Sequence, residues 1–309
     1  MKSSLTFIPS ATGISSVIKD ECLVFTHIPK AAGTTLDRLL KGVGLIKNLP
    51  WNRAFGTVYY QFLGKGKGES LDDFLSWPDS VKSDVRIMTG HVPFGAHEKM
   101  PRDVKYVTLL RDPVSRMLSH FKMGVGRGGW QANEPLSEVL RKGGLVSDVQ
   151  VRMLAGITSP HDKVDDAVLE RALQNLEERY FLVGFSDTFN VFTSALLGYL
   201  DAPNAFLGEE QTSRVKLSKA QENLIKEEAE NFNRYDAIFY EKARSIAERK
   251  FSEFMVEPLQ NPDPENGKHT IVASSQIKFN NSEYSVIPPD QFRPVVNKLV
   301  KKGVTLNGL

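Results

Sequence analysis

The apolar residues of this chain fall into four short, nearly continuous runs, CLVFTHI, VRIMTGH, VKYVTLLRD and YFLVGFSD. Three of these runs are followed, after a polar turn, by apolar residues at helical spacing. Continuous apolar strands that alternate with helices are typical of a parallel sheet covered on both faces. The pattern therefore predicts an α/β fold, a three-layer sandwich with a central parallel sheet flanked by helices.

The helices that follow the first and third strands have clear apolar faces. After the first strand, the residues at positions i, i+3, i+4 and i+7 are Leu36, Leu39, Leu40 and Val43. After the third strand, the corresponding face consists of Val114, Met117, Leu118 and Phe121. Asp112 is placed to cap this second helix, with Pro113 as its first residue.

Two more helices are expected further along the chain. Asp187 is predicted to cap a helix after the fourth strand, whose inward-facing residues are Phe189, Phe192, Leu196 and Leu200. Ser218 and Gln221 form a capping-box pattern, which predicts a long helical region from there to about Phe254.

Composition divides the chain into three parts. Residues 1–20 predict a loosely structured leader, and residues 21–255 form the main domain. Residues 256–309 begin with a linker rich in Pro, Asn and Asp and continue into an extension, where a β-hairpin is expected around Asn280 and Asn281. Within the main domain, the loop-rich stretch from Lys41 to Ser83 is interpreted as a lid or an insertion.

The charge of the chain is nearly balanced. The 309 residues include 39 Lys and Arg against 37 Asp and Glu, a net charge of +2. This argues against nucleic acid or any other extended polyanion as a partner, so an anion site must be local. The single cysteine, Cys22, cannot form an internal disulfide, and no apolar run reaches the roughly 18 to 20 residues that span a bilayer. We expect a soluble, cytoplasmic protein without a membrane-spanning segment.

The turn after the first strand, HIPKAAGTTL, has the composition of an anion site. Backbone N–H groups at a helix N-terminus and the helix dipole favour a phosphate. Gly33 allows close approach of the backbone, Thr34 and Thr35 add hydroxyl donors, and Lys30 adds a cation. The spacing differs from the P-loop pattern G-x-x-x-x-G-K-[ST], because the lysine precedes the glycine by three residues. A solvated lysine in an ordinary turn is the alternative interpretation.

Two further strand ends carry residues suited to the same crevice, because open parallel sheets bind ligands beyond the carboxyl ends of their strands. Arg111 has the planar guanidinium that suits a terminal phosphate, unless it only pairs with Asp112. His91 is expected to be a neutral base near pH 7, with His97 as the second candidate. Ser119, two turns into the following helix, is either a ligand contact or an ordinary surface hydroxyl. No histidine stands at metal-ligand spacing, so no metal is expected.

Three segments, HIPKAAGTTL, TGHVPFG and YVTLLRDPVSRMLSHF, together resemble the sulfotransferases related to heparan sulfate 2-O- and 6-O-sulfotransferases, including their bacterial relatives. The resemblance continues through DVQVRMLAG and NLEERYFLVGFSDTF and more weakly to about Phe254. It implies a P-loop-like version of the α/β fold. It also implies transfer of a sulfuryl group from 3′-phosphoadenosine 5′-phosphosulfate (PAPS), with 3′-phosphoadenosine 5′-phosphate (PAP) as the product.

The resemblance also implies roles for individual residues. The loop for the 5′-phosphosulfate consists of Lys30, Ala31, Ala32, Gly33, Thr34 and Thr35. Lys30 would stabilise the leaving phosphate, and Arg111 and Ser119 would bind the 3′-phosphate. His91 matches the base that deprotonates the acceptor hydroxyl, whereas Arg152 matches a recurrent arginine without an assigned role.

The sequence therefore predicts a PAPS-dependent sulfotransferase that acts without a metal on a hydroxyl acceptor, which the related enzymes suggest is a carbohydrate. A nucleotide-dependent kinase is one alternative, although it would need a standard P-loop and an acidic metal ligand. A non-catalytic module that binds a nucleotide or a sulfated glycan is the other. The aromatic residues that either stack on a sugar or, as we favour, lie in the core are Trp51, Tyr59, Tyr60, Trp77 and Trp130.

Overall fold

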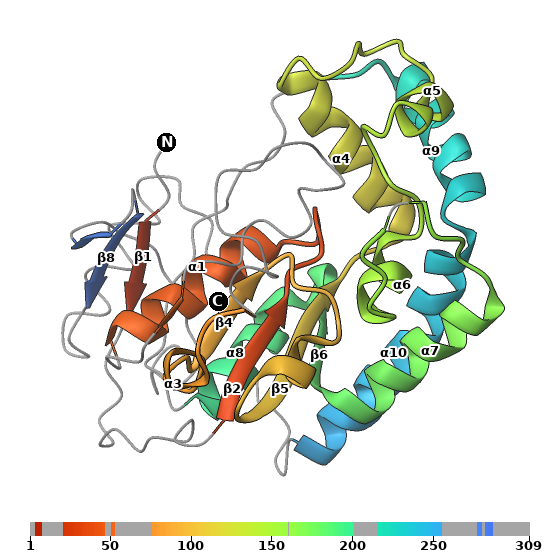
Figure 1. Ribbon diagram of the computed structural model, residues 1–309. Coiled ribbons are helices and arrows are strands. Elements are labelled where there is room, and N and C mark those ends of the chain that lie inside the picture. The colour runs from red at the N-terminus through yellow and green to blue at the C-terminus, as the bar shows by residue number, and fades with distance from the viewer. Residues whose placement is uncertain are drawn as a thin grey trace.

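A computed structural model describes residues 4–7, 21–46, 51–52, 76–159, 161–200, 215–254, 277–279 and 282–286 (Figure 1). Most of the predicted lid from Lys41 to Ser83, including GKGKG, lies outside these residues. So do most of the leader and most of the C-terminal extension.

The centre of the molecule is a parallel sheet with the strand order β3-β4-β2-β5-β6. Its strands are β2 (Glu21–Thr26), β3 (Trp51–Asn52), β4 (Ile87–Gly90), β5 (Asp103–Leu110) and β6 (Tyr180–Phe185). Every pairing in this sheet is parallel. The four apolar runs of the sequence correspond to the four longer strands, and the predicted parallel sheet is confirmed.

Alternate residues of β2 enter two separate cores, one on each face of the sheet. Cys22 and Val24 belong to the core that is covered by α6 (Val149–Leu154), α7 (Asp166–Arg179) and α10 (Arg234–Phe254). Leu23 and Phe25 belong to the core beneath α1 (Gly33–Ile46) and α8 (Phe189–Tyr199). Burying one such side chain contributes about 1.5 to 3 kcal/mol, so a strand with apolar residues on both faces requires both helical layers. The three-layer arrangement is therefore confirmed.

A third core lies beside the sheet, around α4 (Pro113–Gly126). This helix packs against α9 (Lys219–Phe232), and α5 (Leu136–Arg141) also contacts α9 (Figure 1). Two of the three predicted caps are present. The Asp112 side chain accepts the Ser115 N–H at 2.7 Å with Pro113 in the first turn, and Ser218 and Gln221 cap α9 reciprocally.

One predicted helix cap is wrong. Asp187 does not cap α8, because a 3-10 turn, η3 (Ser186–Thr188), precedes the helix and the Asp187 carboxylate pairs with Arg244 at 2.5 Å. The long helical region predicted from Ser218 to about Phe254 is confirmed, and it consists of two helices, α9 and α10, that meet at Asn233. Asn233 has non-helical dihedrals, and its side chain donates to the Ala229 carbonyl, which ends α9.

The remaining elements are short. α3 (Asp79–Lys82) and the 3-10 helix η2 (Ala96–Lys99) flank β4 in the chain. A separate small sheet has the order β1-β8-β7, formed by β1 (Ser4–Phe7), β7 (Ile277–Phe279) and β8 (Ser282–Val286). β7 and β8 pair antiparallel, and the residues between them, Asn280 and Asn281, lie outside the described part. β1, from the leader, pairs parallel with β8.

Candidate functional site

Three of the predicted site segments meet at the carboxyl edge of the sheet. β2 lies between β4 and β5, with Phe25 opposite Thr89 and Thr26 opposite Thr108. A bridge between Thr26 and His91 extends the pairing by one residue beyond β4. The turn that carries Lys30 therefore starts beside His91 on one side. On the other side it lies close to the end of β5, which Arg111 follows.

The turn from His27 to Ala32 has an unusual backbone. Lys30 and Ala32 have φ angles of 68° and 63°, in the left-handed region that residues other than glycine rarely adopt. The Arg111 guanidinium donates to the Lys30 carbonyl at 3.0 Å and so ties the turn to the end of β5. Such strained backbone is typical of functional turns that the surrounding structure holds in place.

Helix α1 begins directly after this turn, at Gly33. The first N–H groups of a helix have no partner within the helix and favour an anion. Gly33 is required here by close packing, because a Cβ at this position would lie 2.0 Å from Cδ2 of His27. Ala31 is buried and Ala32 exposed, while Thr34 is exposed and Thr35 half-buried at the start of the helix.

Lys30 lies in a strongly positive environment. Its ammonium is 3.8 Å from the Met123 sulfur. Burial lowers the pKa of Lys30, and the nearby guanidinium groups of Arg127 and Arg111 lower it further. Burial also lowers the pKa of Arg111. Because partly buried cations that repel one another gain most from a shared anion, this cluster suits a phosphate or sulfate group.

Arg111 does not use Asp112 as its hydrogen-bonding partner. Asp112 caps α4, while one guanidinium nitrogen of Arg111 bonds to the Lys30 carbonyl. The backbone N–H and carbonyl of Arg111 both bond to the side chain of Gln150, at 3.0 and 2.9 Å. The Asp112 carboxylate still acts on Arg111 through its charge, which opposes the effect of burial on the Arg111 pKa, so a pairing with this or another nearby acid stays the alternative to a ligand role.

His91 is buried at the start of the segment that follows β4, and its ring is fixed by the first turn. Nδ1 bonds to the His27 carbonyl oxygen. A carbonyl oxygen only accepts, so Nδ1 carries the proton and Nε2 is the basic nitrogen. Burial lowers the pKa of His91, against an opposing influence of this hydrogen bond and of Asp37. His91 is accordingly neutral near pH 7, the form in which an imidazole accepts a proton.

Asp37 was not singled out by the sequence pattern. It lies on α1 and accepts a hydrogen bond from the Thr89 hydroxyl at the end of β4. Its charge partly opposes the lowering of the His91 pKa by burial. Its position four residues after Gly33, on the first turns of the helix that begins at the anion site, is the only signal for it in the sequence.

One face of α4 carries further polar residues toward Lys30. Met123, which contacts the Lys30 ammonium, lies four residues after Ser119 and four before Arg127, so the three share a helix face. Ser119 is half-buried, and Arg127, at the C-terminal end of α4, is exposed. Arg127 was missed, although its spacing from Ser119 is a visible signal.

His120 is buried, and burial together with the cations Arg116 and Lys30 holds its pKa well below the usual range.

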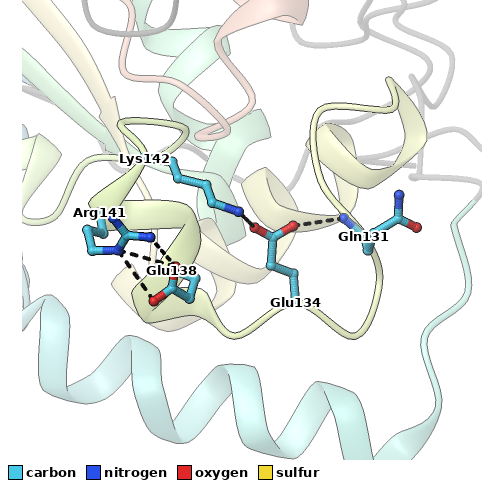
Figure 2. A network of polar contacts seen from close by, with 5 residues as sticks. All are labelled: Gln131, Glu134, Glu138, Arg141 and Lys142. Carbon is cyan, nitrogen blue, oxygen red and sulfur yellow. Dashed lines mark hydrogen bonds and ion pairs between the residues drawn. The ribbon is translucent and has the colours of Figure 1, made fainter.

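The end of α4 that carries Arg127 is held by the chain that follows it. The Trp130 indole donates to the Phe121 carbonyl at 3.0 Å and packs where a side chain at Gly124 would lie. Figure 2 shows the adjoining network, in which Glu134 accepts the Gln131 N–H and pairs with Lys142 at 2.6 Å. The ion pairs of this network are largely exposed and contribute little to stability, but they close the loop between α4 and α5.

His97 lies away from the other candidates. Its Nδ1 is 3.0 Å from the Tyr106 hydroxyl. It lines a cavity of about 690 Å³ together with Glu21, Asp103 and Tyr180, which begin β2, β5 and β6. This cavity is at the amino edge of the sheet, opposite the edge that carries Lys30.

Arg152 is a structural residue. Its guanidinium is buried and donates to three backbone carbonyls, those of Ser147, Ser159 and Asp162. Trp77 and Trp130 are partly buried against apolar cores, as favoured from the sequence. Tyr59 and Tyr60 lie outside the described residues, and the side chain of Trp51 is not described.

A buried pair of carboxyl groups lies behind Arg111, where the first turns of α6 and α10 face each other. Asp148 has no capping bond of its own to α6; instead Asp236 accepts the N–H groups of Gln150 and Val151. In return, Asp148 accepts the Asp236 N–H at 2.9 Å. Each aspartate thus caps the helix of the other. Burial raises the pKa of both carboxyl groups, that of Asp148 to about 7.

Two features are absent from the described part of the chain. It contains no group of three or more His, Cys, Asp or Glu side chains arranged to hold a metal ion. No helix within it combines the length and the apolar character needed to cross a bilayer.

Comparison with known proteins gives relatives among the sulfotransferases, while no family model matches the chain. The chain is 34% identical to heparan-sulfate 6-O-sulfotransferase 3-B of Danio rerio over 111 residues, which are 33% of this chain and 26% of that protein. It is 28% identical to heparan-sulfate 6-O-sulfotransferase 2 of Homo sapiens and of Mus musculus over 208 residues, which are 52% of this chain and 34% of those proteins. The chain thus spans about a quarter to a third of the length of these relatives. The relationship to sulfotransferases that the motifs predict is confirmed.

Among solved structures, the chain is similar to retinol dehydratase in complex with androsterone and the inactive cofactor PAP. The sequence identity is 12% and the TM-score 0.30, over 80% of this chain and 84% of that chain.

Proposed function

We propose that this chain is a PAPS-dependent sulfotransferase that transfers a sulfuryl group to a hydroxyl of a carbohydrate acceptor. The observation that carries the proposal is the convergence of the Lys30 turn, Arg111 and His91 at one edge of the sheet, which joins a cationic anion site to a neutral buried base. The similarity to heparan-sulfate sulfotransferases supports the same assignment.

The donor would be held by two groups of residues. The 5′-phosphosulfate would bind to the turn from Lys30 to Thr35, with N–H groups of α1 and the Lys30 ammonium as donors. Arg111 and Ser119 would bind the 3′-phosphate. Arg111 is half-buried and its guanidinium already bonds to the Lys30 carbonyl, so this group would lose little conformational freedom when it binds.

The reaction would be an in-line displacement at sulfur. Nε2 of His91 takes the proton from the acceptor hydroxyl, as the hydroxyl oxygen bonds to sulfur and the bond between sulfur and the 5′-phosphate oxygen breaks. The released electron pair stays on that phosphate oxygen, where Lys30 and the N-terminus of α1 stabilise the charge. The products are the sulfated acceptor, PAP and a proton on His91, which passes to solvent. The protein residues supply every charge that this step requires.

The acceptor and the compartment follow from two further observations. The relatives are named for heparan sulfate, which supports a sugar hydroxyl as the acceptor. A single buried cysteine supports a reducing compartment, and we propose the cytoplasm.

Calorimetric binding of PAP and of ADP, both without added metal, tests the donor site. We expect the protein to bind PAP in preference to ADP and expect Arg111→Ala to weaken PAP binding by about tenfold or more, the usual cost of a lost charge-assisted hydrogen bond. Arg179→Ala is the matched control, because Arg179 is exposed and lines the cavity at the opposite edge of the sheet. Equal binding of the two nucleotides, or of neither, would refute the proposed donor and favour the alternatives, a kinase or a non-catalytic binding module.

A further inference from the structure

Gln150 makes an unusual pair of bonds at the end of β5. The strand ends at Leu110, and the next peptide groups have no strand partner there. The fully buried side chain of Gln150 accepts the Arg111 N–H at 3.0 Å and donates to the Arg111 carbonyl at 2.9 Å. A carboxamide offers an acceptor and a donor in one plane, and the two partners leave one possible orientation for it. Gln150 therefore fixes the direction in which the Arg111 side chain leaves the backbone.

The side chain of Arg111 also has a bonding partner, in the first turn. Its guanidinium donates to the carbonyl of Lys30, the residue with a φ of 68°. A turn with strained backbone needs such a contact to keep its shape. Arg111 is thus held at two points, its backbone by the Gln150 side chain and its guanidinium by the Lys30 carbonyl.

Gln150 is itself held from a distant part of the chain. The buried carboxylate of Asp236, on α10, accepts the Gln150 N–H at 3.2 Å and the Val151 N–H at 2.8 Å. Asp236 lies 86 residues after Gln150 in the chain. Through these bonds α10 restrains the N-terminus of α6, and with it the residue that clamps Arg111.

We propose that Gln150 is a positioning residue that orients Arg111 toward the 3′-phosphate of the donor. This inference rests on the proposed function and deepens it, because it adds a residue that does not touch the nucleotide to the determinants of donor specificity. It requires that loss of the two bonds from the Gln150 side chain to the Arg111 backbone, here called the clamp, weakens recognition of the 3′-phosphate more than recognition of the rest of the nucleotide.

The test compares PAP with adenosine 5′-monophosphate, which differs from PAP only by the missing 3′-phosphate. Binding of both is measured by calorimetry on the full chain and on Gln150→Met, which keeps the length of the side chain and removes both hydrogen-bonding groups. We expect the preference for PAP to fall by about tenfold to a hundredfold, the range for one lost hydrogen bond to a charged group, with binding of the monophosphate nearly unchanged.

Asn175→Ala is the matched control. It removes another bond between a side-chain amide and a backbone carbonyl, the partly buried one to Leu154 at the other end of α6, and it does not touch Arg111. The preference for PAP should remain at the wild-type value in this variant. If Gln150→Met does not fold, Gln150→Asn serves instead, because its shorter side chain retains the amide and displaces the clamp; it should also lower the preference.

The outcomes are distinguishable. A wild-type protein that binds both nucleotides equally refutes the proposed function. A wild-type preference that both Gln150 variants retain, or a loss of affinity that is equal for the two nucleotides, overturns the positioning role alone and leaves the proposed function in place.

Discussion

Replacement of Asp148 by Asn is expected to stabilise the protein increasingly as the pH rises from 5 to 8. Burial, together with the neighbouring Asp236 carboxylate, raises the pKa of Asp148 from the ordinary 3.8 to about 7. Asp236 accepts two N–H bonds and lies near the Arg116 guanidinium, which favours its ionised form, so we place the proton on Asp148. Near neutral pH the folded protein then holds a proton that the unfolded chain has released.

The sign of the effect follows from proton binding. The folded pKa is above the unfolded one, so between about pH 4 and pH 7 the folded state binds more protons and stability falls as the pH rises. This rise in the pKa of Asp148 corresponds to a loss of about 4 kcal/mol in the free energy of unfolding over the whole titration. About 3 kcal/mol of this loss occurs between pH 5 and pH 8. An asparagine does not titrate, and its oxygen can still accept the Asp236 N–H. The free energy of unfolding of Asp148→Asn therefore does not show this decrease with pH.

Urea unfolding at pH 5 and at pH 8, followed by circular dichroism, gives the free energy of unfolding of both proteins. The advantage of Asp148→Asn over the wild type should be about 3 kcal/mol larger at pH 8 than at pH 5. Asp84→Asn, at an exposed position, is the control and should show no such difference. An advantage that is the same at both pH values would refute the reasoning, because Asp148 would then already be ionised in the folded protein at pH 5.

Three further predictions concern the first turn and the base. Lys30→Ala should lower kcat by about a hundredfold or more and weaken PAP binding far less, since its charge acts mainly on the leaving group; steady-state kinetics and calorimetry would contradict this if both fell equally. His91→Ala should bind PAP normally and lose transfer by about a hundredfold or more, and a fully active variant would remove His91 from the mechanism. Gly33→Ala should lose about 1 to 3 kcal/mol of stability in urea unfolding, because its Cβ would meet the His27 ring, whereas Gly198→Ala, with nothing within 4 Å of its Cβ, should not be destabilised.

Short sequence patterns predict much of the fold. The four apolar runs, the cap at Asp112 and the capping box at Ser218 each depend on a few neighbouring residues, and the structure contains all of them. The cap at Asp187 was predicted by the same kind of reasoning and is wrong, because a contact with Arg244, 57 residues away, takes the carboxylate. Local signals are reliable only where no distant group competes for the same atoms.

The sequence by itself determined the parallel sheet and the positions of Lys30, Arg111 and His91 after their strands, because strand length, turn composition and capping are properties of short segments. Only the tertiary structure decided the strand order, which places β2 and the Lys30 turn between β4 and β5, the strands that His91 and Arg111 follow, and it also placed His97 at the opposite edge. It also decided the clamp of Gln150 on Arg111 and the pair of Asp148 and Asp236. These contacts join residues that are 39 to 88 positions apart, and their hydrogen bonds and pKa shifts arise from burial that exists only once the helices have packed on the sheet.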